Sequence, residues 1–170
     1  MNSLQLIEAF VNTAELEEGT DDLREPAGLV RWLSEHGLSG TSSASEREAA
    51  DARAVREALR ELLRANNGID VDRDGPAAVL EAAARRSGLA VTFDVNGIRL
   101  TPRQDGGLGQ VLAAVAETMA DGSWQKLKAC RSDTCRWAFV DHARNRSRHW
   151  CDMSTCGNRA KARTFRERHA

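Results

Sequence analysis

All four cysteines of this 170-residue chain lie in one short C-terminal stretch. They are Cys130, Cys135, Cys151 and Cys156, with four residues inside each pair and fifteen residues between the pairs. Thiolates are preferred ligands of Zn²⁺, which takes four of them in a tetrahedral structural site. Four thiolates leave no open position for water, so catalysis by the metal is not expected. The spacing therefore predicts a structural zinc site with these four ligands.

Thiol redox chemistry is the alternative use of the cysteines, but the pattern favours a metal. A redox site typically has one CxxC pair beside a βαβ unit, and neither occurs here. Residues 1–10 lack the features of a secretory signal, and the sequence has no apolar run of 18 residues. We therefore expect a cytoplasmic protein without a membrane span, whose thiols stay reduced. His142 and His149 are alternative ligands, although the complete cysteine set favours surface or phosphate-facing positions for them.

The charges of the chain are divided unevenly. Residues 1–125 hold 12 Lys and Arg against 21 Asp and Glu, whereas residues 126–170 hold 12 against 4. A basic unit joined to an acidic one predicts an anionic partner, with DNA as the first choice. The alternative is that the two units only attract each other.

Eight polar side chains of the basic unit are candidates for contacting DNA. Guanidinium groups can hold phosphate oxygens and read guanine through two parallel hydrogen bonds. Arg159, Arg163 and Arg166 have the i, i+4, i+7 spacing of one helix face. The alternatives are a solvated helix face and, for Arg159, a hydrogen bond beside the metal. The eight candidates are Arg144, Asn145, Arg146, Arg148, Arg159, Lys161, Arg163 and Arg166.

The sequence predicts an α+β protein in which two units position these groups. Residues 1–125 form a mainly helical domain with a small β-hairpin, and residues 126–170 form a treble-clef-like zinc finger. Ser45 and Glu48 are spaced as a capping box at the start of the strongest helix. Apolar periodicity predicts helices in the segments 3–16, 26–37, 45–68, 76–86 and 108–122.

Between the last two predicted helices, the apolar period changes from that of a helix to that of a strand. Alternation over residues 91–100 around Asn96-Gly97 predicts a β-hairpin, because both turn residues tolerate positive φ. The helix that follows is expected to turn Val111, Leu112, Val115 and Met119 toward the core.

The cysteine-rich unit, residues 126–170, is short for a domain that folds independently. We predict a strand in "RWAFVD", a second strand near His149 and Trp150, and a helix whose first turn holds Cys156. Its candidate core consists only of Trp137, Phe139, Trp150 and Phe165. We therefore expect the unit to need metal to fold, because zinc binding supplies about 10–16 kcal/mol that so small a core does not.

Several motifs resemble a bacterial family, the CGNR zinc-finger proteins. The motifs are "FVDHARNRSRHWCDM", "CGNRAKAR" at residues 156–163, and the closing "RERH". The chain departs from the family where relatives often have a hydroxyl residue before the arginine, because it has Ala143 there. Upstream, "FVNT", Trp32-Leu33 and "VREALRELLRA" resemble the ABATE domain that precedes the finger in this family. The resemblance implies a stress-induced transcription regulator whose finger binds DNA.

Two classes of function fit the sequence. In the first, a DNA-binding regulator, the N-terminal domain senses a small-molecule effector or forms a homodimer. Asn12, Thr13 and Arg56 are then candidates for lining a ligand pocket, or else they only cap and bridge helices. In the second, zinc holds together a module that binds a protein or a small molecule without DNA. We expect no enzyme, because no nucleophile with a paired base occurs.

Overall fold

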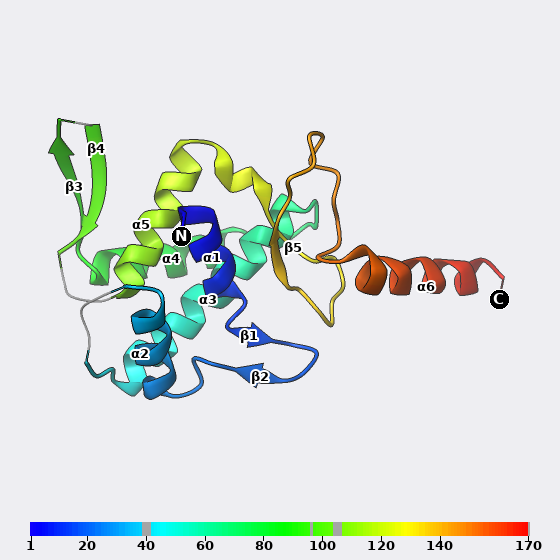
Figure 1. Cartoon of the computed structure of the whole chain (residues 1–170), viewed down its shortest axis with the longest axis horizontal. Coiled ribbons are helices and arrows are strands. Elements are labelled where there is room, and N and C mark those ends of the chain that lie inside the picture. The colour runs from blue at the N-terminus through cyan, green and yellow to red at the C-terminus, as the bar shows by residue number, and fades with distance from the viewer. Residues whose placement is uncertain (39–41, 96, 104–106, 170) are drawn as a thin grey trace.

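Helix α3 (Glu46–Asn66) crosses the centre of the molecule, and four elements pack against it (Figure 1). These elements are α1 (Ser3–Val11), α2 (Pro26–Glu35), α4 (Asp74–Arg86) and the strand β5 (Leu127–Ala129). Helix α5 (Gly107–Ala120) packs on α1. The computed structural model describes residues 1–38, 42–95, 97–103 and 107–169. None of the described helices is long and apolar enough to span a membrane.

Two helices begin with the capping pattern that the sequence predicts for α3. The Ser45 side chain accepts a hydrogen bond from the Glu48 amide, and Glu48 accepts one from the Ser45 amide. Asn2 and Gln5 do the same at the start of α1. Such caps satisfy backbone groups that have no partner inside the helix. The capping box of α3 is therefore confirmed.

The apolar core is continuous from the N-terminal helices into the cysteine-rich segment. Its largest buried members include Ile7, Phe10, Leu59 and Leu63. From the C-terminal side it takes up four residues of two short strands: Leu127, Ala129, Ala138 and Val140. For α5 the predicted core face is wrong at one position, since Met119 is 45% exposed and the adjacent Thr118 is buried. Thr118 is satisfied there because its hydroxyl donates to the Val115 carbonyl.

The predicted hairpin consists of β3 (Leu89–Asp94) and β4 (Gly97–Pro102), which pair in an antiparallel register. This hairpin projects away from the helices next to it (Figure 1). One face carries Phe93 and Ile98, which lie opposite each other and are 78% and 70% exposed. Asn96 of the predicted turn lies outside the described residues. The helix predicted over residues 3–16 ends at Val11 instead, because residues 14–15 form β1 (Ala14–Glu15), which pairs with β2 (Thr20–Asp21) in a second, very short hairpin.

The cysteine-rich segment begins with a 3₁₀ turn, η1 (Ser123–Lys126), that leads into β5. β5 pairs antiparallel with β6 (Ala138–Val140). The second strand expected near His149 and Trp150 is therefore wrong, because the partner of β6 comes from before the first cysteine. Helix α6 (Asn158–Arg168) follows the turn η2 (Met153–Gly157) and extends away from the rest of the chain (Figure 1).

This mixture of helices and small sheets confirms the α+β prediction, whereas the treble-clef likeness stays a prediction. We call residues 1–125 the body and residues 126–169 the cysteine module.

Three asparagine side chains join the body to the cysteine module. Asn12 pairs its amide with both backbone groups of Ala138, as a neighbouring strand would. Asn66 donates to the carbonyls of Trp124 and Leu127. At the end of α3, Asn67 donates to the carbonyls of Ala129 and His149. These bonds fix the start of the module on the body, because a buried carbonyl without a donor costs free energy.

Replacing Asn67 by alanine is expected to lower the free energy of unfolding by about 2–4 kcal/mol. The side chain is buried, and its loss leaves the Ala129 carbonyl without a donor, which costs about 1–3 kcal/mol. It also removes one of the two hydrogen bonds to the His149 carbonyl, worth about 0.5–1.5 kcal/mol, while the Arg131 amide still donates there. Urea unfolding followed by tryptophan fluorescence measures the change. The matched control is Asn145→Ala, since Asn145 is exposed and should change the value by less than about 0.5 kcal/mol. Equal effects of the two variants would contradict this role of Asn67.

Candidate metal centre and basic surface

The side chains of Cys130, Cys135, Cys151 and Cys156 converge on one point. Their sulfur atoms all lie within 4.8 Å of one another. The Cys135 and Cys151 sulfurs are 3.6 Å apart, and those of Cys151 and Cys156 are 3.8 Å apart. A tetrahedral site with Zn–S bonds of about 2.3 Å requires sulfur separations of about 3.8 Å. These two separations match the value that the metal requires, and all four sulfurs lie close enough together to share one ion.

Each cysteine is positioned by the backbone around it. Cys130 directly follows β5, and its amide donates to the Trp137 carbonyl, which closes the first pair into a loop. In this loop the Cys135 amide donates to the Ser132 carbonyl, and Arg136 has a φ of 50°. This left-handed residue reverses the chain immediately after the second sulfur.

The second pair is held by the turn η2. Asp152 caps this turn, because its carboxylate accepts from the Thr155 amide. Cys156 lies in η2, a π-helical turn that runs directly into α6 at Asn158, so the helical segment begins three residues earlier than predicted and its first turn holds Cys156.

Placing four thiols together makes their ionisation unequal. A hydrogen bond from the Cys135 thiol lowers the pKa of Cys130 to about 5, and the same bond raises the pKa of Cys135. Burial, followed by the negative charge on Cys130, raises the pKa of Cys151 to about 12. Four negative sulfurs in this space therefore need a cation to offset their repulsion. A divalent ion that prefers thiolates meets this need, and the four cysteines form a zinc-binding site.

Arg148 supports the metal site from outside the ligand set. Its guanidinium donates to the carbonyls of Trp150 and Cys151 and lies over the Phe139 ring, 4.8 Å from the ring centre. The side chain thus ties the loop that carries Cys151 to strand β6. Groups that orient metal ligands in this way commonly affect metal affinity about 10- to 100-fold.

A buried ion pair shapes the loop between the two cysteine pairs. Lys128 and Asp141 are 4% and 0% exposed, and their charged atoms are 2.8 Å apart. The Lys128 ammonium also donates to the carbonyls of Arg146 and Arg148, while the amides of Ala143 and Arg148 donate to Asp141. Burial alone would raise the pKa of Asp141, but these hydrogen bonds hold it below its usual value. The loop therefore has a fixed shape, including a φ of 50° at Arg146.

The candidate DNA-contacting residues fall into two groups. Arg148 and Arg159 have protein partners, because Arg148 binds the carbonyls described above and Arg159 forms a 2.6 Å ion pair with Glu17. The other six are exposed, although Asn145 accepts from the Ser147 hydroxyl and the Arg166 Nε donates to the Ala162 carbonyl. Those six are Arg144, Asn145 and Arg146 in the loop and Lys161, Arg163 and Arg166 on α6.

The three candidate ligand-binding residues of the body all have protein partners. Asn12 pairs with Ala138, and the Thr13 hydroxyl donates to the Phe10 carbonyl. Arg56 binds both carboxylate oxygens of Asp21, at 2.5 and 2.9 Å. These contacts fit the alternative in which the residues bridge elements, and a role in ligand binding stays a prediction.

Comparison with protein families gives two matches. The family model described as "Putative stress-induced transcription regulator", ABATE, matches residues 4–122, and the CGNR zinc finger model matches residues 126–169. The chain belongs to the ABATE family. Its cysteine module is a CGNR finger, which confirms the resemblance found in the sequence. A search of curated proteins found no match.

Sequence reasoning missed the asparagine that joins the CGNR finger to the ABATE part and the ion pair that shapes the loop of the finger. Lys128, Asp141 and Asn67 are polar residues in ordinary surroundings, and their roles depend on partners 13 to 82 positions away. One available signal is that Asp141 directly follows the apolar run of β6. His149, an alternative ligand in the sequence, instead pairs its Nδ1 with Asn67 at 3.0 Å.

Removing zinc with a chelator is expected to unfold residues 141–169 while the body keeps its helices. In this stretch the buried residues are Asp141, Cys156 and Gly157, so apolar packing alone does not hold it. Hydrogen exchange read by mass spectrometry should show loss of protection there, and one equivalent of Zn²⁺ should restore it. Protection that survives complete removal of the metal would contradict the expectation.

Replacing Arg148 by alanine should weaken zinc binding about 10- to 100-fold, because the Cys151 loop loses its tie to β6. Competition with a chromophoric chelator measures the affinity. Arg144→Ala is the matched control, since Arg144 is an exposed arginine of the same loop. Its zinc affinity should equal that of the unaltered protein, and an equal loss in both variants would point to charge rather than to orientation of the ligand.

Proposed function

We propose that the protein is a DNA-binding transcription regulator in which the zinc site fixes a basic loop and helix α6 for contact with DNA. The observation that carries the proposal is the position of α6. No residue of this helix is buried, and it extends away from the acidic body (Figure 1). Its charged residues are Arg159, Lys161, Arg163, Arg166, Glu167 and Arg168.

A helix with this composition is poorly suited to stand alone in solution. Polar helices without an apolar face gain little from packing, and eleven residues is short for an isolated helix. Five cations against one carboxylate also repel one another. An anionic partner offsets the repulsion. The major groove of DNA admits an α-helix and surrounds it with phosphates, so DNA fits this surface.

The loop supplies a second basic surface with a fixed shape. Arg144 makes no hydrogen bond or ion pair with the described part of the chain, and Arg146 is held at the loop tip by its own carbonyl. Since Lys128 and Asp141 fix this backbone before any partner arrives, little conformational entropy is lost when the arginines bind phosphate. Arg148 and Arg159 are less available for contact with DNA, because both already have protein partners.

We propose that the chain divides into two domains between residues 125 and 126. In this division the body, residues 1–125, regulates the finger. The body would sense an effector or form a homodimer, and the core that it shares with β5 and β6 would carry a change in its packing to the finger. The exposed apolar face of the β3–β4 hairpin supports dimer formation, because such faces usually mark contacts.

Arg163→Ala is expected to weaken DNA binding about three- to tenfold and to reduce the slope of log K against log salt by about one. Arg163 has no partner in the described part of the chain, so its loss should leave zinc content unchanged. Fluorescence anisotropy with duplex fragments of random sequence, followed over a salt series, measures both quantities.

The matched control is Arg85→Ala on α4. Arg85 is exposed and pairs with Glu81 across one helical turn, so its removal changes the net charge equally but on the body. Its effect on DNA binding should be small. If the zinc-loaded protein does not retain DNA even at about 50 mM salt, where phosphate contacts are strongest, the proposal is wrong and an acidic protein partner takes its place.

A further inference from the structure

We propose that Cys135 and Cys151 form a modification site at which a peroxide converts two zinc ligands into a disulfide and releases the metal. This proposal concerns the zinc site alone and holds whether or not the finger binds DNA. It rests on the unequal exposure of the four cysteine residues and on a pocket beside them.

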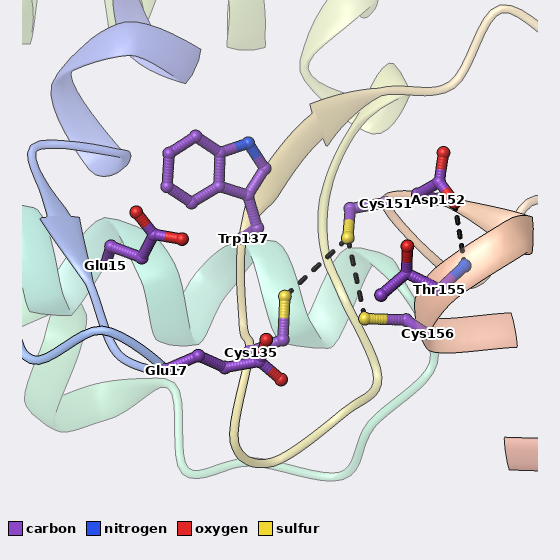
Figure 2. A pocket seen from close by; sticks show the side chains of 8 residues that line it. All are labelled: Glu15, Glu17, Cys135, Trp137, Cys151, Asp152, Thr155 and Cys156. Carbon is purple, nitrogen blue, oxygen red and sulfur yellow. Dashed lines mark hydrogen bonds between the residues drawn. The ribbon is translucent and has the colours of Figure 1, made fainter. Parts of the chain in front are cut away.

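The observation behind it is a pocket of about 300 Å³ next to the sulfur cluster. Figure 2 shows its wall, which is formed by the hairpin residues Glu15 and Glu17 on one side and by the finger on the other. Cys135, Cys151 and Cys156 line the pocket, whereas Cys130 does not. The remaining lining residues are Trp137, Asp152 and Thr155.

Exposure separates the four cysteines into two pairs. Cys130 and Cys156 are 0% and 3% exposed, while Cys135 and Cys151 are only half-buried. The sulfurs of the half-buried pair lie 3.6 Å apart, closer than the Cys151 and Cys156 sulfurs at 3.8 Å. Oxidation of thiols follows thiolate character and access to solvent. Zinc keeps all four sulfurs as thiolates, so access selects Cys135 and Cys151.

The chemistry needs no reactant besides the peroxide. One of the two sulfurs attacks a peroxide oxygen, the O–O bond breaks, hydroxide leaves, and a sulfenic acid forms on that cysteine. The other sulfur then attacks the sulfenic sulfur, the S–S bond forms, and a second hydroxide leaves. The two electrons that reduce the peroxide come from the two thiolates. A disulfide no longer binds zinc, so the site loses two of its four ligands.

The charge of the pocket predicts which oxidants reach the sulfurs. Glu15, Glu17 and Asp152 place carboxylates on the wall beside thiolates. A neutral peroxide enters without electrostatic cost, whereas an anionic disulfide such as oxidised glutathione is repelled and a cationic one such as cystamine is attracted. At low salt, cystamine should therefore release zinc faster than oxidised glutathione does.

Loss of the metal should affect the chain locally. Helix α6 packs mainly against η2, which carries Cys156, so release of zinc frees the basic helix. Strands β5 and β6 should stay in place, because Leu127, Ala129, Ala138 and Val140 belong to the core shared with the body. Thiol reductants reverse a disulfide, so the change is reversible when zinc is present.

The experiment treats the full-length, zinc-loaded protein with hydrogen peroxide. Zinc release is followed with a chromophoric chelator, and the disulfide is identified by alkylation and peptide mapping. We expect release to rise together with a Cys135–Cys151 disulfide, one bond for each zinc ion, and to reverse with dithiothreitol and added zinc. A first disulfide that includes Cys130, or release without any disulfide, would overturn the proposal.

A pair of variants tests whether the pocket is the route. Glu15→Phe places a large side chain on the pocket wall and should slow release severalfold, whereas Glu18→Phe removes the same charge from the same hairpin but outside the wall. Zinc content before oxidation checks that both variants are folded. Equal release rates in the two variants would overturn the assignment of the pocket as the entry path.

Discussion

Zinc coordination is the constraint on which the C-terminal two thirds of the finger depend. Residues 141–169 bury Asp141, Cys156 and Gly157, and so lack the apolar packing that offsets the entropy of ordering a chain. That entropy costs about 1–2 kcal/mol for each residue fixed. Four thiolates on one ion supply about 10–16 kcal/mol in comparable small sites, which is enough to hold η2 and the start of α6. The metal thus does here what a hydrophobic core does in the body.

The remainder of the finger is held differently, because its strands belong to the body. Strands β5 and β6 place their side chains in the common core, and Asn12, Asn66 and Asn67 bind their backbone edges. The buried pair of Lys128 and Asp141 then extends this order into the following loop. A buried ion pair gains little net free energy over apolar residues, but breaking it by removing one partner is costly. Its effect is therefore to fix one loop conformation rather than to add stability.

The sequence predicted the features that depend on local spacing and missed those that depend on distant partners. Four cysteines in two close pairs determine a metal site without knowledge of the fold, and Ser45 with Glu48 determines a helix start. The partner of β6 was misassigned because β5 spans only three residues, which is too short to show the alternation typical of a strand. Met119 and Thr118 differ by one position, about 100° around a helix, and apolarity alone favoured the wrong one. Asn66 and Asn67 carry no local signal, because their partners lie on other elements.

The attraction between the acidic body and the basic finger is too weak to cover the basic surface of the finger. The ion pair between Glu17 and Arg159 is 2.6 Å long, but the Arg159 side chain is 61% exposed, and exposed pairs contribute only about 0.2–1 kcal/mol. Beyond a Debye length of about 8 Å the acidic body attracts the finger weakly at physiological salt. A phosphate that binds a guanidinium through two hydrogen bonds can displace such a contact. Under the proposed function, the acidic body repels the DNA polyanion at close range, so an approaching duplex would be turned toward α6 and the loop. The charge division between the two units would then orient the DNA instead of closing the chain on itself.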